Sequence, residues 1–197
     1  MDTSRRKYIR IFIFILFVNI IIVSCKEPYT PKPKAYLRMD FPKKEYRLFT
    51  SDCKFSFEYP KYGEVNNVRL STAEPCWYDI DIKDYKAAIH LTYKPLSGGN
   101  LSAHVEDIRR IVYKHIIKAD DIIENRIIEP DKKVYGILYD IKGNTASSVN
   151  FYITDSVSGF LSGSLYFNVE PNKDSLAPAI QFFRKDIVHL IHSFSWE

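Results

Sequence analysis

The segment VNFYITDSVSGFLSGSLYFNV, residues 149–169, contains two alternating stretches on either side of one short turn. In residues 149–154 and again in 161–169, large apolar side chains occupy every second position, except at Gly163. A period of two predicts half-buried β-strands. Residues 155–159 hold Asp, Ser and Gly, which favour a turn. The stretch therefore predicts an antiparallel hairpin at the centre of a sheet.

The residues around this hairpin extend the sheet and add a helix. Residues 134–141 and 122–128 predict two further strands, so the hairpin belongs to an antiparallel meander. After it, Asp174 is expected to cap a helix with one apolar stripe, which predicts packing on a sheet face. The stripe consists of Leu176, Ile180, Phe183, Ile187, Leu190, Ile191 and Phe194.

The first half of the chain repeats the order of strands followed by a helix. Alternation predicts strands over residues 55–59, 77–82 and 87–93, and 65–70 is a candidate partner strand. Asn100 is the expected N-cap of a helix whose apolar positions follow a 3.6-residue period. These positions are Leu101, Val105, Ile108, Ile111, Val112 and His115. Strands, helix, strands and helix together predict an α+β fold, an antiparallel sheet with two main helices packed on it.

The N-terminus has the three parts of a bacterial lipoprotein signal. A basic start is followed by a 13-residue apolar run over 11–23, which Asn19 alone interrupts, and Cys25 stands directly after Ser24. The run is too short to span a bilayer. This pattern predicts a signal peptide over residues 1–24 and acylation of the Cys25 thiol; the alternative is an uncleaved N-terminal anchor. A Pro-rich tether is expected over 25–45 and one domain over 46–197.

Composition narrows the class of protein. With 46% hydrophobic and 15% aromatic residues in 197, the chain is not disordered over most of its length. The net charge of +4 suggests an anionic partner, but residues 1–24 carry four basic and one acidic residue, so the mature chain carries +1. Nucleic-acid binding is therefore not expected.

Two cysteines remain after lipidation, Cys53 and Cys76. In an oxidising, exported setting an even remainder favours a disulfide, and the alternative is two buried free thiols. Closing a loop of this length stabilises a protein by about 3 kcal/mol in the chain-entropy treatment.

We find no motif of an established catalytic class: there is no nucleophile elbow, no phosphate-binding loop and no zinc-protease helix. Asp79 and Asp81 share a strand face with Asp84 nearby, and could bind a hard cation. His189 and His192 stand three apart on the last helix, with Asp186 the only carboxylate at ligand spacing. Solvated strand and helix faces explain both groups better, so no metal or cofactor is expected.

Several short segments resemble known families. The segment FSFEYP, residues 55–60, and the final HSF, residues 192–194, are similar to the Mog1/PsbP-type sandwich. Seven segments, which together extend over nearly the whole mature chain, resemble the GldD gliding-motility lipoprotein family of Bacteroidetes. They are PKPKAYLR (31–38), TYKP (92–95), HIIKADDI (115–122), VYG (134–136), GN-x-AS (143–147), FY-x-TDS (151–156) and GSLYF (163–167).

The GldD resemblance implies a cell-envelope lipoprotein required for gliding and for type IX protein secretion, with partners in that machinery. It carries no catalytic residues, so a non-enzymatic accessory component is expected, held on the membrane through Cys25. We expect it to face the periplasm, and the choice between inner and outer membrane stays open. The alternative is an extracytoplasmic module that binds a small ligand or a cation.

Overall fold

The computed structural model describes residues 6–10, 12–13, 39–68 and 74–197. The chain divides into two units, residues 1–35 and 36–197. In the first, the described residues are helical. No helix within the described ranges has the length and apolar character needed to cross a bilayer. The predicted signal peptide lies largely outside these ranges, and Cys25 lies wholly outside them.

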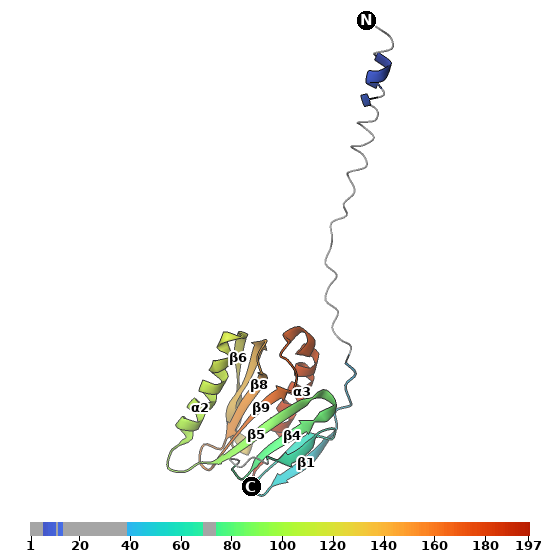
Figure 1. Cartoon of the computed structure of the whole chain (residues 1–197). Helices are drawn as coiled ribbons and strands as arrows, with labels where there is room; N and C mark the ends of the chain where they lie inside the picture. The colour runs from blue at the N-terminus through green and yellow to red at the C-terminus, as the bar shows by residue number, and fades with distance from the viewer. Residues whose placement is uncertain (1–5, 11, 14–38, 69–73) are drawn as a thin grey trace. The chain divides into compact units, whose positions relative to one another are not determined.

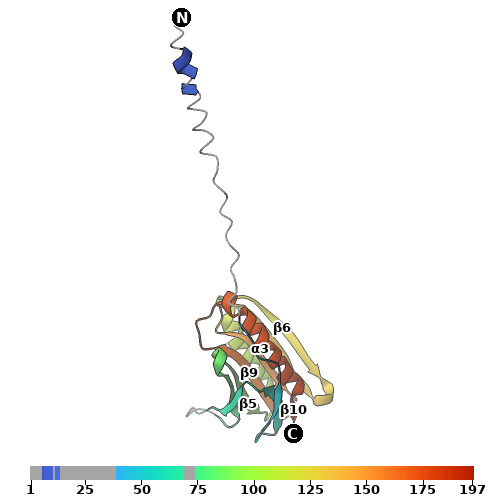
Figure 2. The ribbon, with the colours of Figure 1, turned by 90° about the vertical axis from the view of Figure 1, so that its right-hand side faces the viewer.

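The second unit contains two antiparallel sheets. A sheet of seven strands has the order β3-β4-β5-β9-β8-β7-β6, and a sheet of three has the order β1-β2-β10 (Figures 1 and 2). The large sheet comprises β3 (Glu64–Asn67), β4 (Trp77–Ile82), β5 (Ala87–Pro95), β6 (Ala119–Glu129), β7 (Val134–Gly143), β8 (Ser147–Thr154) and β9 (Gly159–Phe167). The small sheet comprises β1 (Tyr46–Ser51), β2 (Phe55–Pro60) and β10 (Ser195–Trp196). The predicted strands are present, except that the candidate strand over 65–70 is observed as β3 up to Asn67 and its residues 69 and 70 lie outside the described ranges. The second sheet is an addition that alternation did not predict.

Two long helices cover opposite faces of the large sheet. Helix α3 (Lys173–Ser193) packs its apolar stripe on the face that also contacts the small sheet, and both share one core. Helix α2 (Leu101–Tyr113) lies on the other face over a smaller core around Val112 and Tyr139. A short 3-10 turn, Lys114–Ile117, leads from α2 into β6. The predicted α+β fold is therefore confirmed, with β8 buried along its whole length between the two helical layers.

Three local predictions need correction. Helix α3 begins after Asn172, whose side chain accepts a hydrogen bond from Ser175 N, so Asp174 lies inside the first turn rather than at the cap. Asn100 is the N-cap residue of α2 as predicted, but its amide oxygen accepts a hydrogen bond from Ser97 N rather than from the first turn of the helix. Ile111 was expected on the packed face of α2 and is 43% exposed. The small core beneath α2 does not extend far enough to cover it.

Residues of the predicted tether pack against the domain. Phe41 stacks on Phe182 of α3 with ring centroids 4.3 Å apart, and Met39 also contacts the main core. The apolar side chains near the end of the tether segment explain this packing, because burying them removes apolar surface from water.

Candidate functional site

The acidic strand face does not gather into a cation site. Asp79 binds the imidazole of His90 through Nδ1, and Asp81 accepts a hydrogen bond of 2.9 Å from Asn66 Nδ2. Within the described ranges no group of three His, Cys, Asp or Glu side chains could hold a metal ion. The carboxylates proposed as weak cation ligands therefore have other partners.

The two histidines of α3 also point to separate partners. His189 Nε2 lies 2.6 Å from Glu58 Oε2 on β2, and its ring stacks on Tyr46 at a centroid distance of 3.6 Å. His192 pairs with Glu129 at the end of β6. Because each imidazole faces a different carboxylate, the pair does not converge on one ion.

Asp186, the carboxylate beside these histidines in sequence, forms a separate buried cluster. It is 1% exposed and accepts hydrogen bonds from Lys44 Nζ at 2.7 Å, from Tyr46 OH at 3.0 Å and from Tyr62 OH. Burial, and after it Asp186, raises the pKa of both tyrosines, and burial lowers the pKa of Lys44. Through Lys44, the cluster links the segment before β1 to α3 by hydrogen bonds and an ion pair. We assign it a structural role.

A disulfide joins Cys53 and Cys76, whose Cα atoms are 6.2 Å apart. It links the loop after β1 to the residue before β4, and so connects the small sheet to an outer strand of the large one. The bridge lies among structural contacts and away from the hollow described next.

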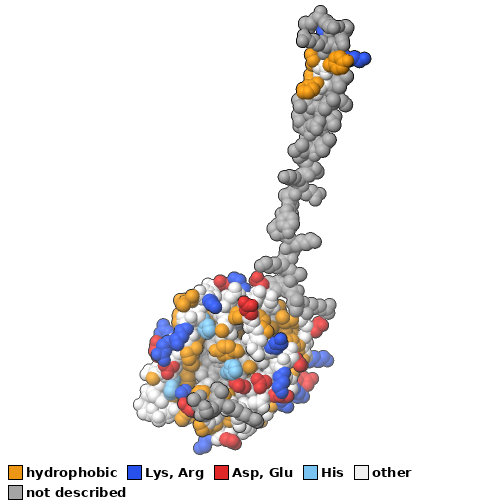
Figure 3. All heavy atoms as spheres, in the orientation of Figure 1, with side chains coloured by type: hydrophobic (Ala, Val, Ile, Leu, Met, Phe, Trp, Pro, Cys, Tyr) orange, Lys and Arg blue, Asp and Glu red, His pale blue; other side chains and the backbone are white. Residues whose placement is uncertain are grey.

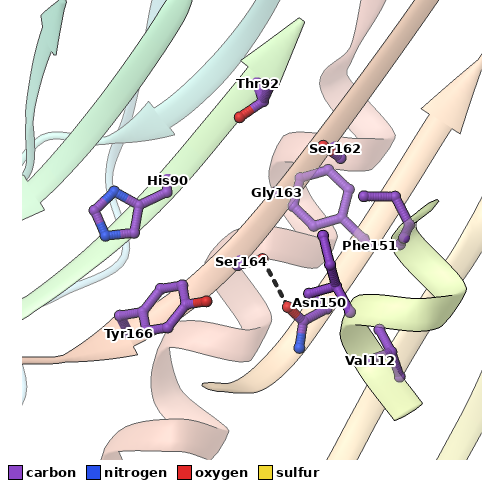
Figure 4. Close-up of a pocket in the computed structure, with 11 residues that line it drawn as sticks. His90, Thr92, Val112, Asn150, Phe151, Ser162, Gly163, Ser164 and Tyr166 are labelled. Atoms are coloured by element: carbon purple, nitrogen blue, oxygen red, sulfur yellow. Dashed lines mark hydrogen bonds between the residues drawn. The ribbon is translucent and has the colours of Figure 1, made fainter. Parts of the chain in front are cut away.

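The face of the large sheet beneath α2, here called the α2 face, carries a hollow of about 370 Å³. Its wall is apolar and comes from the helix, whereas its floor is mostly polar and comes from β5, β8 and β9 (Figure 4). The wall is Ile108, Ile111 and Val112, and the floor carries His90, Thr92, Asn150, Ser162, Ser164 and Tyr166. Figure 3 shows this side of the protein, where histidine side chains lie beside acidic ones.

Strand register explains how these residues meet. Asp79 pairs with His90, His90 with Ser164, and Ser164 with Asn150, so one row of side chains runs across β4, β5, β9 and β8. The residue types of this row match an acid, a base and a nucleophile. However, Ser164 Oγ donates to Asn150 Oδ1 at 2.6 Å, and no hydrogen bond joins it to His90 in the part of the chain that the structure describes. The geometry therefore lacks the contact that would activate the serine.

Asn150 has a buried side-chain donor whose hydrogen bond is not satisfied by the described residues. The residue is 2% exposed, and its amide oxygen accepts hydrogen bonds from Ser147 and Ser164. Its amide nitrogen has no hydrogen-bond partner among the described residues. Figure 4 shows this nitrogen turned away from Ser164, between Tyr166 and Val112 in that view. An unsatisfied buried donor costs about 1–3 kcal/mol, so such groups usually have a partner.

A second hollow of about 590 Å³ adjoins the first, and His90 and Tyr166 line both. It adds Asp81, Lys83 and Lys86 at the end of β4 and the start of β5. Lys83 pairs with Glu64 at 2.5 Å, so its charge is balanced. The two hollows together offer an elongated surface along the sheet that carries both polar and apolar groups.

The sequence did not single out this site. Asn150, Ser162, Ser164 and Tyr166 occupy the alternate positions of two strands, which usually face solvent. One feature of the sequence could have indicated the site: α2 also has an apolar side, so a second helix was expected to pack on the sheet and cover part of it. Polar residues at a covered position are less common than at an exposed one.

Comparisons with known proteins agree with the fold and with the sequence resemblance. A family model described as gliding motility lipoprotein GldD matches residues 26–196. No curated protein matches the chain. Among solved structures, the solution structure of cyanobacterial PsbP (CyanoP) from Synechocystis sp. PCC 6803 is similar, with a TM-score of 0.50 and 8% identity. The similarity covers 85% of this chain and 100% of that one, which confirms the predicted PsbP-like sandwich and shows the fold alone.

Proposed function

Since the chain belongs to the GldD family of gliding-motility lipoproteins, we propose that it is a non-enzymatic accessory component of the gliding and type IX secretion machinery. The observation that carries the proposal is the family match over residues 26–196, nearly the whole chain after the expected lipidation site. The missing contact between Ser164 and His90 supports the non-enzymatic part. The proposed partners are proteins of the same machinery.

We further propose that acyl chains on Cys25 hold the protein on the membrane and that the domain faces the periplasm. Each buried CH₂ of an acyl chain contributes about 0.8 kcal/mol, so a single chain binds the membrane only marginally and several chains make a stable anchor. Substituting Cys25→Ser is expected to leave the precursor uncut and unlabelled by a palmitate analogue. Labelling of the variant at the wild-type level would refute the assignment.

The end of α2 offers a surface on which such a partner could dock. Ile117 is 90% exposed and Ile116 is 60% exposed, and both lie in the 3-10 turn Lys114–Ile117, with Lys118 between this turn and β6. Strand β6 is an edge of the large sheet, and edge strands have backbone groups free to pair with another chain. An apolar surface beside a sheet edge suits a protein partner that adds a strand.

The test is complementation of a deletion strain, scored for both colony spreading and type IX secretion. Wild-type protein is expected to restore both, and Ile117→Asp is expected to reduce both by placing a charge in the docking surface. Val157→Asp is the matched control, because Val157 is 79% exposed on the turn between β8 and β9. Normal spreading and secretion in the deletion strain would refute the accessory role, and full rescue by Ile117→Asp would refute this docking surface.

A second candidate function is an extracytoplasmic module that binds a small ligand. The hollow beneath α2 favours it, as does the amide nitrogen of Asn150, which has no partner within the described ranges. The cation-binding form of this alternative has less support, since Asp79 and Asp81 engage other side chains. Accessory function and ligand binding are compatible in one protein.

A further inference from the structure

We propose that the hollow between α2 and the large sheet binds an uncharged saccharide, held by Asn150 and the surrounding hydroxyl groups. The inference rests on the ligand-binding candidate function and not on the accessory role. The first support is the buried amide nitrogen of Asn150, a hydrogen-bond donor that lines the hollow without a partner among the described residues. An oxygen atom of a ligand would satisfy it.

The polar groups around Asn150 suit a ligand rich in hydroxyl groups. Thr92, Ser162 and Tyr166 add three hydroxyls to the floor, and in the described part of the chain none of the three makes a side-chain hydrogen bond. A hydroxyl both donates and accepts, so it pairs with the hydroxyls of a sugar in either sense. A hydrocarbon ligand would leave these groups and the Asn150 amide unpaired.

The charge of the hollow favours a neutral ligand. His90 is the one ionisable side chain besides Tyr166 in its lining, and its Nδ1 is bound to the Asp79 carboxylate. The Asp79 carboxylate therefore already occupies the polar edge of this ring. An anion such as phosphate would find no uncompensated cation here, and a metal ion would find no set of carboxylates.

The shape of the hollow also fits a sugar. The side chains of Ile108 and Ile111 supply apolar surface opposite the polar floor, and the ring of Tyr166 adds apolar area to the floor itself. A pyranose has the same division, with C–H groups on its faces and hydroxyls at its rim. A volume of about 370 Å³ lies within the range of small-molecule sites. The adjoining hollow of about 590 Å³ leaves room for a second unit.

The experiment uses the full chain, ¹⁵N-labelled and purified in detergent micelles. It is titrated with glucose, galactose, N-acetylglucosamine, lactose and chitobiose, and with N-acetyl-trialanine amide as a peptide probe. At least one sugar is expected to shift the side-chain NH₂ resonance of Asn150 in a saturable way. Ile111→Lys is expected to weaken the binding of that sugar at least tenfold, because a lysine side chain at this position would extend across the mouth of the hollow. Val157→Lys, at an exposed position outside both hollows, is expected to leave the affinity unchanged.

The outcomes separate this inference from the function on which it rests. If no sugar binds and the peptide shifts the Asn150 resonance, the saccharide assignment is wrong and the ligand-binding function stands. If neither a sugar nor the peptide binds, the saccharide assignment and the ligand-binding function are both wrong. If a sugar binds but Ile111→Lys leaves its affinity unchanged while the variant stays folded, the hollow is not its site.

Discussion

Removing the carboxylate of Asp186 should destabilise the domain more than any exposed ion pair could. This side chain is 1% exposed and accepts three hydrogen bonds, from Lys44, Tyr46 and Tyr62. In Asp186→Ala, Lys44 keeps its bond of 2.9 Å to the carbonyl oxygen of Phe182 but loses its counter-charge. Breaking a buried ion pair on one side lowers the free energy of unfolding by about 3–5 kcal/mol.

Thermal and urea unfolding of the purified protein measure this effect. At about 2–4 °C per kcal/mol for a domain of this size, the melting temperature is expected to fall by about 6–20 °C. Glu45→Ala is the matched control, since Glu45 pairs with Lys61 at 3.1 Å while both side chains are more than half exposed. That change should stay below about 1 kcal/mol.

A double-mutant cycle then isolates the pair. The double variant Lys44→Met/Asp186→Ala should be destabilised by less than the sum of the two single changes. Each single variant leaves one charge without its partner, whereas the double variant leaves neither charge. If Asp186→Ala lowers the free energy of unfolding no more than Glu45→Ala does, the Asp186 cluster does not stabilise the packing of the N-terminal segment against α3.

Three further perturbations test other parts of the fold. Because the folded-state pKa values of Tyr46 and Tyr62 lie above their ordinary 10.0, the unfolded chain loses those protons first and stability should fall as the pH rises above about 10. The lowered pKa of Lys44 opposes this fall, and replacing both tyrosines with Phe should flatten it in urea unfolding at a series of pH values. Reducing the Cys53–Cys76 bridge, which spans 23 positions, should lower the free energy of unfolding by about 3 kcal/mol, and an unchanged melting temperature under reductant would count against it. Gly136→Ala would place a Cβ 1.9 Å from a carbonyl oxygen of β8, so a loss of about 1–3 kcal/mol is expected in urea unfolding, and wild-type stability of the variant would count against the clash.

Local sequence predicted much of the architecture because periodicity is a local property. The alternation over residues 149–169 placed β8 and β9, and the stripe on α3 placed that helix on a sheet. The caps were less predictable, since Asn172 and Asp174 are both good capping residues two positions apart. Which of the two residues caps α3 depends on the path of the loop that connects β9 to the helix.

Periodicity and motifs were enough to predict the α+β class, the antiparallel meander, the family and the two cysteines that the bridge joins. The pairing of β1, β2 and β10 in a second sheet could be seen only in the folded chain, because alternation does not encode strand partners far apart in the sequence. The same holds for the burial of Asp186, and for the position of Asn150 beneath a helix, where its amide nitrogen finds no partner among the described residues. A period of two or 3.6 tells which side chains share a face, but burial and hydrogen bonding depend on what the rest of the chain brings against that face.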